Sequence, residues 1–106
     1  MRADRLEQVF LKRTGAGFEL LLVLESGAGR RERVTLTAPP AVARSERAAM
    51  EYLIRWLRNR GATLAGLVRV RREAGGELVD APELRGLLLE AQLGENGEQD
   101  VDDLWD

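Results

Sequence analysis

The sequence predicts an α+β fold in which a mainly antiparallel sheet carries two helices packed on one of its faces. Three observations lead to this class: three apolar segments joined by short glycine turns, a capped amphipathic segment in the middle of the chain, and a weaker helical pattern near residue 85. The expected order is β-β-β-α-β-β-α in a single domain, residues 1–94, followed by an acidic, disordered tail, residues 95–106.

The first three segments have the composition of strands. Residues 6–13, 18–25 and 31–37 are separated by turns that contain Gly15, Gly17, Gly27 and Gly29. Short turns between consecutive strands predict an antiparallel meander. The second strand is apolar on both faces, because Leu21 and Val23 alternate with the leucines of its other face. Such a strand lies in the middle of a sheet or faces a partner on its second side.

The central helix is predicted over residues 46–60, with a start one turn earlier, near Ala41, as the alternative. Ser45 can accept a hydrogen bond from the first turn, and Gly61 can adopt the left-handed conformation that ends a helix. Apolar residues between them recur at spacings of three and four and form one stripe, which we expect to cover the sheet: Ala49, Met50, Leu53, Ile54 and Leu57.

A second strand pair and a second helix follow. Residues 64–73 predict a fourth strand, which can run antiparallel, or parallel to the first or third strand after a crossover. Gly75 and Gly76 suit a tight turn into a short edge strand, residues 77–79. Asp80 is expected to cap a helix that has Pro82 in its first turn and Gly94 as its stop. Its apolar stripe is Leu84, Leu87, Leu88 and Ala91.

The beginning of this order, β-β-β-α-β, resembles the ribonuclease H-like fold, and the resemblance is one of element order. It implies carboxylates on the first and fourth strands that hold metal. The corresponding strands here offer Glu7 and Glu73 alone.

The composition argues against an enzyme. The chain contains no cysteine and no histidine, so thiolate chemistry and the usual general base at neutral pH are missing. We therefore predict no catalytic residues, no metal site and no cofactor. No apolar run of about 18 residues is present, so we expect no membrane partner and a cytoplasmic location.

The charges are unevenly distributed along the chain. Residues 1–94 hold all 16 basic and 12 of the 18 acidic side chains, a net charge of +4, whereas residues 95–106 hold six carboxylates, a net charge of −6. Arginines on one surface could neutralise phosphates and bind single-stranded nucleic acid. This alternative assigns that role to Arg30, Arg31, Arg33, Arg55, Arg58, Arg69 and Arg71. Against it, Glu51 lies four residues from both Arg47 and Arg55, the spacing of weak ion pairs on an exposed helix.

The acidic tail contains Val101, Leu104 and Trp105, which one helical turn would bring together. Short acidic segments of this kind bind grooves by ordering on a partner. In composition the tail resembles the tails through which single-strand-binding proteins recruit partners. It could equally dock on its own protein or a second copy, or serve solubility alone.

The function predicted from these features is that of a small non-enzymatic protein-binding or regulatory module. It would engage a protein partner, or a second copy of itself as a homo-oligomer, through a sheet face and the tail. The residues assigned to this contact are Leu21, Val23, Val101, Leu104 and Trp105.

Overall fold

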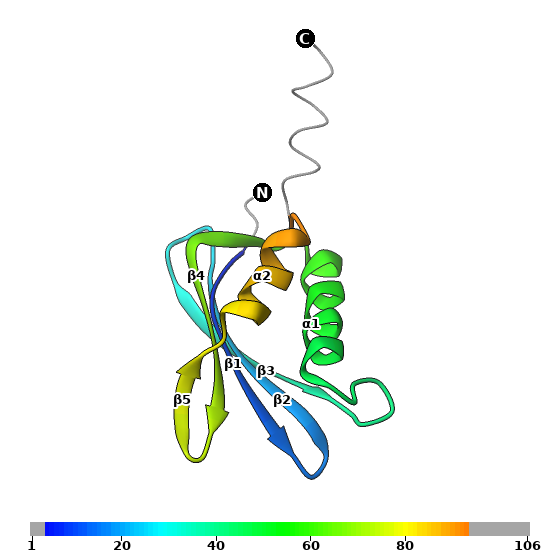
Figure 1. Cartoon of the computed structure of the whole chain (residues 1–106). Helices are drawn as coiled ribbons and strands as arrows, with labels where there is room; N and C mark the ends of the chain where they lie inside the picture. The colour runs from blue at the N-terminus through cyan, green and yellow to red at the C-terminus, as the bar shows by residue number, and fades with distance from the viewer. Residues whose placement is uncertain (1–3, 94–106) are drawn as a thin grey trace.

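The computed structural model describes residues 4–93 and has a mixed five-stranded sheet with two helices (Figure 1). The α+β class is therefore confirmed. The elements follow the predicted order: β1 (Arg5–Thr14), β2 (Gly17–Glu25), β3 (Arg31–Ala38), α1 (Glu46–Arg60), β4 (Thr63–Ala74), β5 (Glu77–Asp80) and α2 (Pro82–Glu90). The predicted tail, residues 95–106, lies outside the described residues.

The strand order in the sheet is β3-β2-β1-β4-β5. Strands β1 to β3 form the predicted antiparallel meander, and β4 and β5 form an antiparallel hairpin. Strand β4 lies beside β1 and runs parallel to it, which decides between the orientations that the sequence left open. A parallel pairing needs a long connection, and α1 is part of the connection that returns the chain to the start of β4.

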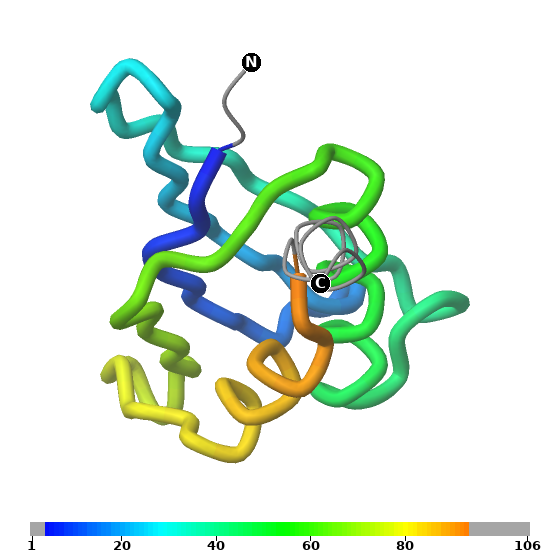
Figure 2. Tube along the Cα trace, turned by 90° about the horizontal axis from the view of Figure 1, so that it is seen from above, coloured from blue at the N-terminus to red at the C-terminus, as the bar shows by residue number. Residues whose placement is uncertain are grey.

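One hydrophobic core lies between the sheet and the helices, which sit side by side on the same side of β1 and β2 (Figures 1 and 2). The predicted stripe of α1 is buried, as are the alternate side chains of β2: Phe18, Leu20, Leu22 and Leu24. Since both helices cover this face, the opposite face of the sheet has no helix or strand over it within residues 4–93.

The predicted ends of α1 are confirmed. The Ser45 hydroxyl accepts a hydrogen bond from the Ala48 N–H at 3.1 Å, and Gly61 has a left-handed φ of +72°. The predicted cap of α2 is wrong. Asp80 pairs with Arg71 in the β4–β5 ladder, so its backbone belongs to β5 and Ala81 precedes the helix without a side-chain cap. Pro82 does begin α2, whereas the predicted stop, Gly94, lies outside the described residues.

Arg72 joins β4 to the first turns of both helices. Its guanidinium donates two hydrogen bonds of 2.9 Å to Glu46 of α1 and another to Glu83 of α2. The hydrogen bonds to Glu46 and then Glu83 raise the pKa of Arg72, and the hydrogen bond from Arg72 lowers the pKa of Glu83. The pair between Arg72 and Glu83 is therefore sensitive to acid.

Replacing Glu83 with glutamine should reduce stability at pH 7 more than at pH 3. The folded pKa of Glu83 lies below its ordinary value of 4.5, so its contribution is complete above that value and is lost as the pH falls through the folded pKa. Urea denaturation of both proteins at the two pH values measures this difference. Glu90→Gln is the control, because Glu90 makes no ion pair within residues 4–93. An equal loss at pH 7 and pH 3 would contradict the prediction.

Candidate functional site

The side of the sheet without helices, called the open face below, carries a row of apolar side chains from three strands, β2, β1 and β5, with β4 lying between the last two. Leu21 of β2 is opposite Phe10 of β1, and Leu78 of β5 lies beyond them, with Val23 next along β2. The exposed fraction is 36% for Leu21 and 49% for Leu78, whereas Phe10 and Val23 are half-buried. The two predicted residues, Leu21 and Val23, therefore do lie on a face without a helix.

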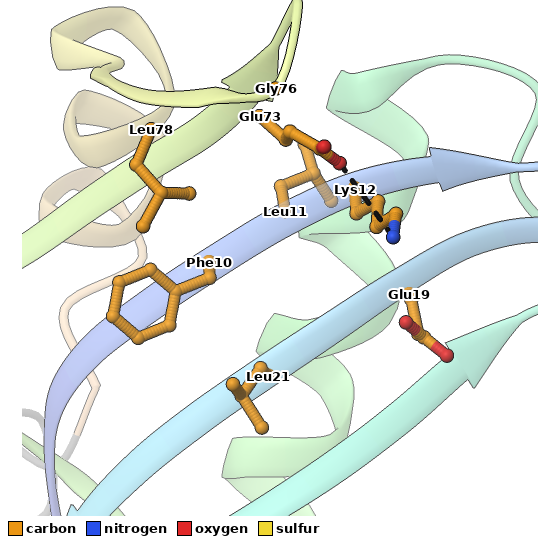
Figure 3. Close-up of a pocket in the computed structure, with 8 residues that line it drawn as sticks. All are labelled: Phe10, Leu11, Lys12, Glu19, Leu21, Glu73, Gly76 and Leu78. Carbon is orange, nitrogen blue, oxygen red and sulfur yellow. Dashed lines mark ion pairs between the residues drawn. The ribbon is translucent and has the colours of Figure 1, made fainter.

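An open depression of about 340 Å³ lies in this row (Figure 3). The side chains of Phe10, Leu21 and Leu78 are grouped along it, and the Lys12 ammonium pairs with Glu73 at 3.8 Å beside them. The depression is thus mainly apolar, with charged groups at one end.

Phe10 is held in place by a basic neighbour. The guanidinium carbon of Arg71 lies 4.7 Å from the centroid of the Phe10 ring, and Arg71 Nη2 donates to Gln8 Oε1 at 3.1 Å. A cation over an aromatic face is favourable by about 0.5–1 kcal/mol at an exposed site. This contact covers part of the ring and orients it on the sheet.

The two ends of the open face carry different charges. Lys12, Glu19 and Glu73 lie toward the β1–β2 turn. Arg33 and Arg69 lie toward the other end, where Arg69 pairs with Asp80 at 3.9 Å, together with the ion pairs Arg5–Glu25 and Arg31–Glu7. Glu19 and Arg33 make no ion pair with any other residue of the described chain. The end near the β1–β2 turn therefore has a net charge of −1, and the other end is positive. Each end has one charged side chain without an ion pair within residues 4–93: Glu19 at the first and Arg33 at the second.

The arginines of the nucleic-acid alternative do not form one surface. Arg33, Arg69 and Arg71 lie on the open face, Arg30 lies in the β2–β3 turn, and Arg31 pairs with Glu7 at 2.7 Å. The remaining two, Arg55 and Arg58, lie on α1, on the other side of the sheet. The predicted tail residues Val101, Leu104 and Trp105 lie outside the described residues.

No site was assigned from the sequence to half-buried Phe10 or to the exposed Leu67 and Leu78. Leu67 is 85% exposed because β4 bulges away from β1, with Leu64 paired to Leu6 and Arg69 already paired to Gln8. A glycine inside a strand is the usual sequence signal of a bulge, and Gly66 supplies it. Phe10 and Leu78 lack a comparable signal, since their significance depends on which strands become neighbours.

Within residues 4–93 no polar or charged side chain is buried, and no group of three or more acidic side chains is placed to hold a metal ion. Glu7 and Glu73 lie toward opposite ends of the sheet, and each pairs with a basic side chain. Neither α1 nor α2 is long and apolar enough to cross a membrane.

Fold and site together define a small α+β domain with helices on one side of its sheet and a partly apolar open face on the other. No protein-family model matches the chain, and no curated protein or solved structure is found to be similar to it.

Proposed function

We propose that the protein is a small non-enzymatic protein-binding module whose open face pairs with the open face of a second copy. The observation that supports this function is the uncovered row formed by Phe10, Leu21 and Leu78, with Val23 beside it. Apolar side chains grouped on an exposed surface are typical of sites where another protein binds.

The charges of the open face favour a second copy as the partner. A two-fold axis that lies in the interface, perpendicular to the strands, brings the acidic end of one copy over the basic end of the other. Glu19 of β2 then approaches Arg33 of β3 in the other copy, and both groups lack an ion pair among residues 4–93. A two-fold contact makes each complementary pair twice, and two-fold dimers are the commonest soluble homo-oligomers.

The size of the face predicts a reversible dimer. Five strands spaced by about 4.8 Å and about eight residues long cover roughly 630 Å² in plan. A standard stable interface removes about 800 Å² of accessible surface from each partner. Accessible surface follows the contours of the side chains, so it is larger than the plan area of the same face. The buried area therefore lies at the small end of the range for stable protein interfaces. We expect an equilibrium in which the fraction of dimer rises with protein concentration.

Replacing Leu21 with glutamate is expected to abolish this dimer, because it places a carboxylate in the centre of the apolar row. Sedimentation velocity over a concentration series should show a rising sedimentation coefficient for the unmodified protein and a constant monomer value for Leu21→Glu. The matched control is Leu89→Glu, since Leu89 of α2 is 46% exposed on the helix side; it should behave like the unmodified protein.

Charge reversal tests the geometry of the pair. Glu19→Arg and Arg33→Glu should each weaken the dimer, and the double variant should restore it. A monomer at every concentration, or equal effects of Leu21→Glu and Leu89→Glu, would refute the proposal.

The nucleic-acid alternative is supported by Arg33, Arg69 and Arg71 lying on the same face as Phe10. Glu7, Glu19, Glu25 and Glu73 on or beside that face reduce its positive potential. Two results together would favour this function instead. The protein would remain a monomer, and it would bind a single-stranded oligonucleotide in a salt-dependent way that Arg33→Glu abolishes.

A further inference from the structure

A second surface feature lies on the helix side of the molecule. A groove of about 450 Å³ runs between α1 and α2, with Ile54, Leu87 and Ala91 contributing apolar surface. Charged side chains line the rest of it: Arg47, Glu51, Arg55, Arg58 and Glu90. The groove shares no lining residue with the depression of the open face.

The basic groups of this groove are incompletely matched. Arg47 pairs with Glu51 at 3.5 Å, whereas Arg55 and Arg58 have no carboxylate within 4.0 Å among residues 4–93. Arg58 Nη2 instead donates to the backbone oxygen of Ala91 at 3.0 Å, where α2 ends. Two guanidinium groups one turn apart on α1 are therefore available to an acidic ligand.

The chain itself supplies an acidic segment at this place. The described chain stops at Leu93, which is buried against the core and lies two residues after Ala91, a residue of the groove lining. Residues 95–106, which follow, carry six carboxylates, no basic group and three large apolar side chains: Val101, Leu104 and Trp105.

The segment is long enough to follow the groove. Leu93 and Leu104 are eleven residues apart, so an extended chain between them spans up to about 36 Å. Arg58 and Arg47 are also eleven residues apart, but on a helix that separation is about 16 Å. A partly folded segment can therefore place its apolar residues anywhere along α1.

We propose that residues 95–106 bind in cis in the α1–α2 groove, with carboxylates at Arg55 and Arg58 and apolar side chains over Ile54, Leu87 and Ala91. Tethering favours this contact, because a short linker holds the segment at an effective concentration in the millimolar range. The body has a net charge of +4 over residues 1–94, so long-range attraction acts in the same direction. The docked segment would cover the groove and leave the open face free.

Trp105 provides the readout. The chain has two tryptophans, Trp56 and Trp105, so Trp56→Phe leaves Trp105 as the single fluorophore in the full chain. We expect its emission to be blue-shifted and its quenching by acrylamide to be lower than in urea. Raising the salt from 0.1 M to 1 M shortens the Debye length from about 10 Å to 3 Å, so it should increase the quenching.

Arg55→Glu in this background should raise the quenching toward the value in urea. Arg30→Glu is the matched control, since it makes the same charge change in the exposed β2–β3 turn and should leave the quenching unchanged. The protection should not vary with protein concentration and should persist when Leu21→Glu is added, which separates this proposal from the dimer of the open face.

Three results would overturn the proposal. Quenching equal to that in urea would mean that Trp105 does not dock. Protection of Trp105 that is unaffected by Arg55→Glu would mean that the segment docks outside the groove. Protection that increases with protein concentration would show that the segment binds to a second copy.

Discussion

Gly17→Ala is expected to lower the free energy of unfolding by about 2–6 kcal/mol, combining backbone strain with the overlap of an added side chain. Gly17 begins β2 with a φ of +117°, which L side chains rarely adopt. A Cβ atom there would lie 2.2 Å from the backbone oxygen of Ala38 and 3.0 Å from Pro39 Cα. Because these are backbone atoms, the end of β3 must move, and the pairing of Phe18 with Ala38 moves with it.

Urea denaturation followed by circular dichroism measures this effect. A small domain is stable by about 5–15 kcal/mol, so the loss is a large share of the total. Gly15→Ala in the same turn is the control, since no atom lies within 4 Å of the position that its Cβ would occupy. Equal midpoints for the two variants would show that the backbone at Gly17 relaxes freely.

Leu53→Ala should cost about 2–5 kcal/mol, the range for truncating a fully buried leucine. Leu53 lies in the middle of the stripe of α1 and is 0% exposed, so its removal leaves a cavity between the helix and the sheet. Thermal and urea unfolding of the variant measure the loss.

Leu67→Ala serves as the comparison for Leu53→Ala. The same atoms are removed, but Leu67 is 85% exposed on the β4 bulge and should change stability by less than about 0.5 kcal/mol. Comparable losses in the two variants would mean that Leu67 is covered in solution, which would make the bulge part of an interface.

Helix α1 shows how much the sequence can predict. Its boundaries agree with the structure because each signal acts within a few residues: the Ser45 hydroxyl reaches the Ala48 N–H, and Gly61 closes the last turn. The alternation in β2 likewise predicts which side chains share a face. The failure at Asp80 has the opposite cause, since pairing with Arg71, nine residues away in the chain, overrides a local capping pattern.

The candidate site was predicted in part. Leu21 and Val23 were found because alternation alone shows that β2 has two apolar faces. Phe10 of β1 and Leu78 of β5 lie near these residues only because of the order of the strands in the sheet. No local sequence pattern specifies that order. The seven arginines looked like one group in sequence, but the crossover through α1 places Arg55 and Arg58 on the other side of the sheet from Arg33, Arg69 and Arg71.

By itself the sequence determined the α+β class, the order of the elements, the caps of α1, and the core-facing residues of α1 and β2, because these depend on spacing along one segment. The tertiary structure decided the parallel pairing of β4 with β1, the bulge that exposes Leu67, and the meeting of Phe10, Leu21 and Leu78. These features depend on how distant segments align when the core closes, and burial of the whole apolar surface determines that alignment.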